Sequence, residues 1–165
     1  MRLRTLLRNR LSMTAALAVV AMGALSLPAA PASAAPIYWS FRNTFTGKCL
    51  TAGVSNGRTG KAYVATCTYG ASQEWDWVNG VKGDEELRSK ATGLCLDTDN
   101  KSATNTVWTS SCGLFSDGEY YSYSHDLRSD LGTHLRTDPH DASAVYATRS
   151  KATDGAYFAW TGSTN

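Results

Sequence analysis

Four cysteines are the side chains in this sequence best suited to covalent chemistry or metal binding: Cys49, Cys67, Cys95 and Cys112. A zinc site is disfavoured, because no C-x-x-C pair occurs and the histidines do not fall at ligand spacings around the cysteines. Four cysteines allow three disulfide connectivities. The separation of 18 residues in the first pair is almost repeated by 17 in the second. We therefore predict the disulfides Cys49–Cys67 and Cys95–Cys112, as if one bridge had been duplicated, and no metal.

No known catalytic motif accompanies the cysteines. The chain has no G-x-S-x-G elbow, no H-E-x-x-H helix and no phosphate-cradling glycine loop. His134 is expected to pack or pair locally rather than act as a base. Carboxylate pairs such as Asp97 with Asp99, or Asp138 with Asp141, would suit a glycosidase only if they faced each other across a cleft. The sequence therefore predicts a protein that is not an enzyme, with no catalytic residue and no cofactor.

The first 34 residues are typical of a secretory signal peptide. A basic stretch that ends at Arg10 precedes an apolar run from Leu11 to Leu27, and Ala32-Ser33-Ala34 is an A-x-A cleavage signature. We expect cleavage after Ala34, which leaves a secreted, extracellular chain of residues 35–165 with oxidised cysteines. An uncleaved membrane anchor is the alternative, because the apolar run is almost long enough to span a bilayer.

The composition favours a compact, turn-rich β protein. Of the 165 residues, 18% are charged and 10% are aromatic, and 14 are glycine. This balance excludes a disordered charged chain and argues against a long coiled coil. The formal charge of +2 depends on four leader arginines, so the rest of the chain is slightly acidic. No basic field is left to bind nucleic acid, and no later segment is apolar enough to make a membrane a partner.

Three copies of one unit follow the leader. A glycine two residues before the first cysteine position recurs as Gly47, Gly93 and Gly132. In the third unit His134 and Arg149 take the two cysteine positions, so this unit has lost its bridge. The units are predicted to span about 39–83, 84–124 and 125–165, with Asp84-Glu85-Glu86 forming a solvated loop between the first two.

Each unit contains short runs of alternating apolar and polar residues, separated by Gly, Asn, Asp and Ser, which predicts strands and turns. About four strands fit in a unit. A unit of about 40 residues cannot bury a sufficient core alone, so the three should share one. The prediction is an all-β protein, a β-trefoil of three four-stranded repeats with two disulfides inside repeats. A solenoid is the alternative, but three repeats without caps would leave exposed edges.

The motifs of the units resemble those of the ricin B-type lectin domain. Gln73-Glu74-Trp75 is an intact Q-x-W near the end of the first unit, and Cys95-Leu96-Asp97 is similar to the family's C-[LV]-D. The resemblance covers nearly all of residues 39–160. It implies a β-trefoil that binds galactose or other sugars, in a family often attached to a hydrolase or toxin.

The resemblance also implies which residues would hold a sugar. In the family, the acid after C-[LV] accepts hydrogen bonds from two sugar hydroxyls, beside an aromatic platform and an amide. Only the second unit has this acid, as Asp97, because Thr51 and Arg136 stand at the equivalent positions.

The second unit departs from the family at two further positions. Ser110 stands where the family has its aromatic residue, so Trp108, two residues earlier on the same strand face, is expected to replace the platform. Glu119 stands in place of the Gln of Q-x-W. The candidate sugar-binding residues are therefore Asp97, Asn105, Trp108 and Glu119. Turn capping by Asp97 and ordinary packing of Trp108 are the alternatives.

Three functions follow from these features. The leading one is a secreted, non-catalytic, lectin-like protein whose partner is carbohydrate, either a galactose-type sugar or a polysaccharide. The second is a trefoil that binds or inhibits an extracellular protein such as a protease, through the turn 68–72 or the segment 138–141. The third is a hydrolase built on the same scaffold, which would lose activity when one carboxylate is changed.

Overall fold

A computed structural model describes residues 35–165, apart from 82, 139, 142 and 152–154. The predicted signal peptide, residues 1–34, lies outside the described residues. Within the part of the chain that the structure describes, no helix is long and apolar enough to cross a membrane.

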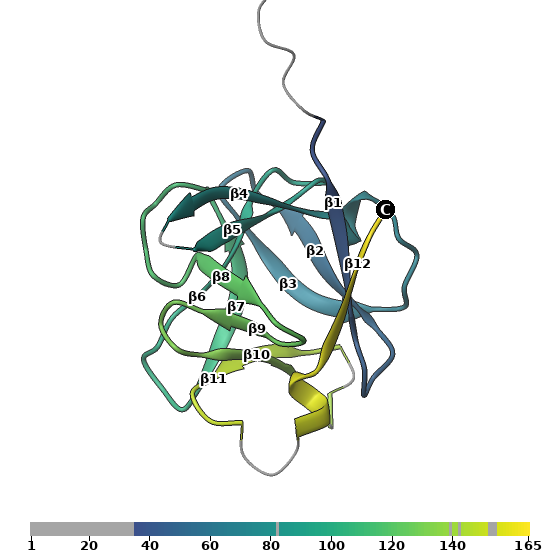
Figure 1. Cartoon of the computed structure of the whole chain (residues 1–165), viewed down its shortest axis with the longest axis vertical. Coiled ribbons are helices and arrows are strands. Elements are labelled where there is room, and N and C mark those ends of the chain that lie inside the picture. The colour runs from purple at the N-terminus through teal and green to yellow at the C-terminus, as the bar shows by residue number, and fades with distance from the viewer. Residues whose placement is uncertain (1–34, 82, 139, 142, 152–154) are drawn as a thin grey trace, which may run out of the picture. The chain divides into compact units, whose positions relative to one another are not determined.

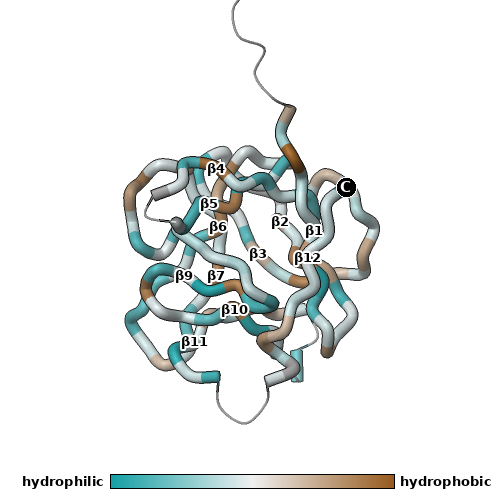
Figure 2. The backbone as a smooth tube through the Cα atoms, viewed as in Figure 1, coloured by the Kyte–Doolittle hydropathy of each residue, from teal (hydrophilic) through white to brown (hydrophobic). Residues whose placement is uncertain are grey.

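Short strands dominate the described residues, which contain no α-helix. Hydropathy changes at short intervals along the backbone (Figure 2), as expected for strands with one buried face. The first unit contains β1 (Tyr38–Asn43), β2 (Cys49–Ser55), β3 (Thr59–Ala65) and β4 (Trp75–Val81). The second contains β5 (Asp84–Ser89), β6 (Cys95–Thr98), β7 (Thr104–Ser110) and β8 (Tyr120–Tyr123). The third contains β9 (Leu127–Ser129), β10 (His134–Thr137), β11 (Val145–Thr148) and β12 (Trp160–Thr164). Two 3-10 helices precede β4 and β12, namely η1 (Ala71–Gln73) and η2 (Gly155–Phe158).

The strands form a ring and three hairpins (Figure 1). In the ring, β1 pairs with β4 and β12, β4 with β5, β5 with β8, and β8 with β9, all antiparallel. The hairpins are β2–β3, β6–β7 and β10–β11, and they join through the pairs β3–β7 and β7–β11. The predicted all-β architecture is confirmed: the chain folds as a β-trefoil of three four-stranded units.

The first and last strands run side by side (Figure 1). Trp39 pairs with Thr164 and Asn43 with Trp160. The backbone N–H of Asn165 also donates to the carbonyl of Tyr38 at 3.0 Å. Strands from opposite ends of the described chain therefore complete the ring.

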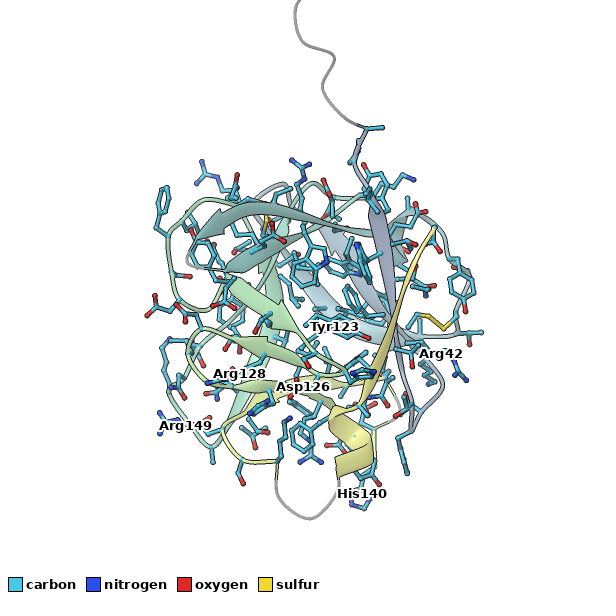
Figure 3. All side chains as sticks on the ribbon, in the orientation of Figure 1. Arg42, Tyr123, Asp126, Arg128, His140 and Arg149 are labelled. Carbon is cyan, nitrogen blue, oxygen red and sulfur yellow. A yellow bond between two sulfur atoms is a disulfide. The ribbon has the colours of Figure 1, made fainter. Side chains whose placement is uncertain are left out.

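The strand register corrects one detail of the repeat alignment. In both bridged units, the residue facing the first cysteine lies two positions before the second cysteine. In the third unit His134 faces Thr148, so the second cysteine position is Ser150. The prediction of Arg149 for this position is wrong by one residue, because the turns differ in length and only the ladder fixes the equivalence. Arg149 lies on the surface (Figure 3) and donates to the carbonyl of Asn100 at 2.9 Å.

The three units share one core, to which each contributes equivalent residues. Trp75 and Trp160 hold the same position in the first and third units, and both are fully buried. The indole N–H of Trp75 donates to the carbonyl of Leu50 at 3.1 Å, and that of Trp160 to the carbonyl of Leu135 at 3.0 Å. Each bond ties a ring strand to the hairpin of its own unit. The second unit has Tyr121 at this position, buried but without an indole.

Both predicted disulfides are confirmed. Cys49 is bonded to Cys67, and Cys95 to Cys112, and each bridge lies within one unit. Each connects the start of a hairpin strand to the segment that follows the hairpin. The bridges therefore close the first and second hairpins, while the third is held by its ladder and its packing.

Replacing Cys95 and Cys112 together by serine should lower the free energy of unfolding by about 3 kcal/mol, because the unfolded chain loses a closed loop. Urea unfolding followed by circular dichroism measures the change. The matched double variant of Cys49 and Cys67 should cost a similar amount, since its loop of 18 residues differs by only one. A large difference between the two variants would contradict an effect set by loop length.

Candidate functional site

Two of the predicted sugar-binding residues meet through a serine in the second unit. Asp97 lies on β6, Ser110 at the end of β7, and Glu119 just before β8. The Ser110 hydroxyl lies 3.0 Å from Asp97 Oδ2 and 3.2 Å from Glu119 Oε1. Asp97 is only 6% exposed and Glu119 is fully buried. The two carboxyl groups therefore belong to a buried cluster.

A third carboxyl group, that of Glu86, completes this cluster. The prediction of a solvated loop at 84–86 is wrong, because β5 begins at Asp84 and Glu86 is fully buried. Glu86 accepts hydrogen bonds from the backbone N–H of Gly113 at 2.6 Å and from the Asn79 side chain. Ser40 holds the equivalent position on β1, and its burial, like that of Glu86, is visible only in the structure. We call Glu86, Asp97 and Glu119 the acidic trio.

The first unit shows what the trio replaces. There Gln73 fills the position of Glu119 and is also buried. Its Oε1 accepts from the backbone N–H groups of Thr68 at 2.7 Å and Tyr69 at 3.1 Å. Its amide nitrogen donates to Thr51 Oγ1 at 3.1 Å and to the carbonyl of Thr66 at 2.9 Å. Gln73 is thus a structural residue that both accepts and donates within its own unit.

A carboxylate at position 119 can accept in the same way but cannot donate. Glu119 Oε2 accepts from the backbone N–H of Leu114 at 3.0 Å. Ser110 has one hydroxyl proton and can give it to Asp97 or to Glu119, but not to both. A proton on Glu119 restores the missing donor, so the geometry favours its neutral form.

The pKa values agree with this geometry. Burial, the neighbouring Glu86 carboxyl and the Asp97 charge raise the pKa of Glu119 from 4.5 to about 7. Burial also raises the pKa of Asp97, although hydrogen bonds from Ser110, the Thr98 backbone and Trp108 oppose the rise. The acidic trio therefore takes up a proton at a pH where an exposed glutamate is ionised.

The segment 113–118 covers the trio. Gly118 is buried directly over β6, where an added Cβ would lie 1.9 Å from the Thr98 carbonyl oxygen and 2.8 Å from Asp97 Oδ1. The backbone N–H of Thr98 donates to the Gly118 carbonyl at 3.2 Å. Only glycine fits this approach. The Asp97 carboxylate thus faces groups of its own chain.

Trp108 is the member of the predicted site that reaches the surface. It lies opposite Asp97 in the β6–β7 ladder and opposite Lys61 in the β3–β7 ladder. Its side chain is near enough to the Asp97 carboxylate to lower the pKa of that group. The half-buried ring lines an open depression of about 520 Å³ with Asn56, Gly60 and Lys61 of the neighbouring hairpin. The register places Tyr63 and Tyr146 at the equivalent positions of the other units.

Asn105 does not join this group. It is 2% exposed, and its Oδ1 accepts from the backbone N–H of Ser102 at 2.8 Å. Its amide nitrogen donates to the carbonyls of Ser102 at 3.0 Å and Ala147 at 3.2 Å. These bonds hold β7 against β11. The structure thus brings together Asp97, Trp108 and Glu119, and places Asn105 elsewhere.

Two other clusters of ionisable side chains are accounted for by their own contacts. The Glu86 carboxylate lies near the sulfur atoms of Cys95 and Cys112, but these form a disulfide and are not the thiolates that bind metals. His134 Nδ1 lies 2.9 Å from Asp126 Oδ2, which confirms the expected local pairing. Lys151 also contacts Asp126, so this carboxylate is neutralised in place.

The fold is a β-trefoil whose three units share one core. Two of these units carry a disulfide, and the second has the family's acid after C-L, Asp97. A sequence model of the ricin-type β-trefoil lectin domain matches residues 38–160. The chain therefore belongs to the ricin-type β-trefoil lectin family, as the resemblance of its motifs predicted. This family is generally non-catalytic. A comparison with curated protein sequences gives no significant match.

Solved structures share the fold at low sequence identity. ThreeFoil, a designed threefold-symmetric protein, superposes with a TM-score of 0.61 and 19% identity, over 76% of this chain and 96% of its own. The exo-β-1,3-galactanase of Clostridium thermocellum gives 0.66 and 14%, over 78% of this chain and 30% of that enzyme. The BEL β-trefoil gives 0.62 and 13%, over 84% and 98%. At these identities the likeness establishes the fold alone.

Replacing Glu119 by glutamine should make the protein more stable at pH 8. Because the pKa of Glu119 is raised in the folded state, its stabilising contribution is present below pH 4.5 and is lost as the pH rises through 7. Glutamine carries no such charge and can donate as Gln73 does. The melting temperature of the variant should exceed that of the wild type at pH 8 by about 5 °C, with a much smaller difference at pH 4.5.

The reciprocal change, Gln73→Glu, is the matched control. It places a carboxylate 2.9 Å from the Thr66 carbonyl oxygen in the first unit, so it should create a new loss of stability between pH 5 and 8. Melting curves across this range measure both effects. Identical pH profiles for the wild type and Glu119→Gln would contradict a protonated Glu119.

Proposed function

We propose that this protein is a secreted, non-catalytic carbohydrate-binding protein whose sugar site in the second unit is built around Trp108. Membership of the ricin-type lectin family supports carbohydrate as the class of ligand. The observation that carries the site is the position of Trp108. Its ring lines an open depression, and the residue opposite it in the β6–β7 ladder is Asp97.

The depression offers the two kinds of contact that a sugar needs. The indole ring gives a flat apolar surface for the C–H face of a pyranose. Lys61 and Asn56 are exposed at its rim and can donate hydrogen bonds to hydroxyl groups. A shallow site of this kind binds a single sugar weakly, so a polysaccharide with repeated units is the natural ligand.

The other three predicted residues are buried and support the position of Trp108. Asp97 lies opposite Trp108 in the β6–β7 ladder and positions its ring from there. Glu119 positions Asp97 through the shared Ser110 hydroxyl. Asn105 fixes β7, the strand that carries Trp108, against β11. In this proposal Trp108 touches the sugar, and the other three residues are positioning residues.

Replacing Trp108 by alanine should weaken polysaccharide binding by about tenfold or more, because the stacking surface is lost. The assay uses purified, oxidised residues 35–165 in pull-down and calorimetry with β-1,3-galactan, xylan, cellulose and chitin, and with free galactose and lactose. Asp97→Asn should weaken binding less, since it keeps the shape of the side chain beside Trp108 and removes only its charge.

Tyr63→Ala is the matched control, because Tyr63 holds the equivalent position in the first unit and also reaches the surface. It should leave binding unchanged. Full binding by a folded Trp108→Ala protein would move the site elsewhere. A wild-type protein that binds none of these probes would overturn the carbohydrate-binding proposal.

A protein partner is the second candidate function. Leu114 and Phe115 are 58% and 79% exposed, and Phe115 has a left-handed backbone with φ of 56°. Such an apolar tip on the segment 113–118 suits insertion into a partner. Of the two loops favoured by the sequence, 68–72 is described, whereas Pro139 in 138–141 lies outside the described residues. Competition of soluble sugar with any bound protein would separate the two functions.

A further inference from the structure

A second hollow lies on the ring of strands and shares no lining residue with the Trp108 depression. It has a volume of about 360 Å³, and its wall includes Trp39 of β1, Trp77 of β4, Glu85 of β5 and Tyr123 of β8. We call it the aromatic hollow. Strand β1 meets its hairpin at Arg42, three residues after Trp39. The hollow is therefore on the part of the ring away from the hairpins.

The rings of the hollow are fixed by their contacts with one another. Phe41, which is fully buried, contacts three of them from the core. Trp77 meets Phe41 edge-on at 5.9 Å between ring centroids, and Tyr123 meets it edge-on at 5.3 Å. Trp39 lies 6.2 Å from both Phe41 and Tyr123. These geometries are favourable for aromatic pairs, so the hollow is formed before any ligand arrives.

Tyr123 is held further by β12, beside which it lies (Figure 3). Its hydroxyl donates to the carbonyl of Trp160 at 3.1 Å and accepts from the backbone N–H of Gly162 at 2.7 Å. A Cβ on Gly162 would lie 3.1 Å from the Tyr123 ring and 3.2 Å from Phe41. The absence of a side chain at Gly162 is what lets the ring pack here.

Equivalent positions of the three units carry different residues, so the hollow forms only where the first and second units meet. The register makes Trp77, Tyr123 and Gly162 equivalent, because each faces the core residue of the adjoining first strand. Trp39 and Glu85 are likewise equivalent, since each faces the core aromatic of its neighbouring strand. The first unit thus supplies two tryptophans, and the second supplies a carboxylate and a tyrosine.

Glu85 decides the chemistry of the ligand. It is exposed and lies against Gly80 of the β4–β5 hairpin, with no hydrogen bond or ion pair to any described residue. A purely apolar ligand would bury this carboxylate without a partner, which is costly. A sugar ring places C–H groups on the aromatic faces and a pair of hydroxyls on the two carboxylate oxygens.

We infer that the aromatic hollow is a second carbohydrate-binding site, which takes one neutral pyranose ring of a glycan against Trp39 and Trp77 with Glu85 as hydroxyl acceptor. The inference rests on the proposed function, which it extends to a second site. Two sites on one small protein raise its avidity for a polysaccharide well above that of either alone.

The test compares the wild type with Glu85→Ala, Trp108→Ala and the double variant, each assayed by calorimetry and pull-down with soluble β-1,3-galacto-oligosaccharides, β-1,3-galactan, xylan and chitin. Each single variant should lose about tenfold in apparent affinity for the polysaccharide that binds, since hydrogen bonds to charged groups and stacking contacts are of this size. The double variant should not bind. Asp84→Ala, next to Glu85 on the other face of β5, is the matched control and should bind normally.

Tryptophan fluorescence reports the hollow directly. The chain has five tryptophans, and in Trp108→Ala only Trp39 and Trp77 remain partly exposed, because Trp75 and Trp160 are buried. Titration of this variant with the same oligosaccharides should shift its emission, and Glu85→Ala should abolish the shift.

The outcomes separate the two proposals. Loss of all binding in Trp108→Ala, with Glu85→Ala unaffected, would overturn the hollow and leave the proposed site standing. Loss only in Glu85→Ala would support the hollow and overturn the Trp108 site. Absence of binding by the wild type would overturn both. Because Glu85 is exposed, its variant should remain folded, and a melting curve equal to that of the wild type verifies this.

Discussion

The hydrogen bond from a buried indole to the carbonyl of a hairpin leucine connects the two parts of this fold. Trp75 makes it to Leu50 and Trp160 to Leu135. Each bond satisfies a backbone carbonyl inside the core and fixes the angle between a ring strand and its hairpin, which a purely apolar contact would leave adjustable. The orientation of the first and third hairpins depends on this connection, and with it the first-unit wall of the Trp108 depression.

The second unit lacks this indole, and the residues around that position differ from those of the first unit. Tyr121 fills the position, and the acidic trio lies where the first unit has Ser40, Thr51 and Gln73. Three buried carboxyl groups would be prohibitive if all were ionised and unpaired. Backbone N–H groups of Gly113 and Leu114, the Ser110 hydroxyl and a retained proton on Glu119 make the cluster tolerable. The family-like motif Cys95-Leu96-Asp97 is therefore part of an interior that differs from that of the first unit.

The sequence contained enough information for the repeat, the fold and both disulfides, because these depend on spacing. Gly47, Gly93 and Gly132 mark the same turn in each unit, and the cysteines recur at nearly the same distance. Features that depend on register could not be predicted. Glu86 looked like part of a polar run, although the ladder places it in the core. The aromatic hollow is likewise not visible in the sequence, because its walls come from strands far apart in the chain.

Asn105 illustrates the same limit within the candidate site. It lies close to Trp108 in sequence, and an amide beside an aromatic ring suggested a shared ligand. In the structure the two side chains have different neighbours. The hydrogen bonds of Asn105 are made to Ser102 and Ala147. Only the arrangement of neighbouring strands shows which polar side chains are already satisfied.

The pairing of β1 with β12 allows the order of the strands along the chain to be changed. Because Trp39 faces Thr164, the two ends of the folded unit are neighbours, and a short linker could join them without disturbing the ring. New ends could then be opened at the exposed residues 114–117, since loop tips tolerate such cuts. The trefoil is thus a natural candidate for circular permutation, with its chain order independent of its threefold architecture.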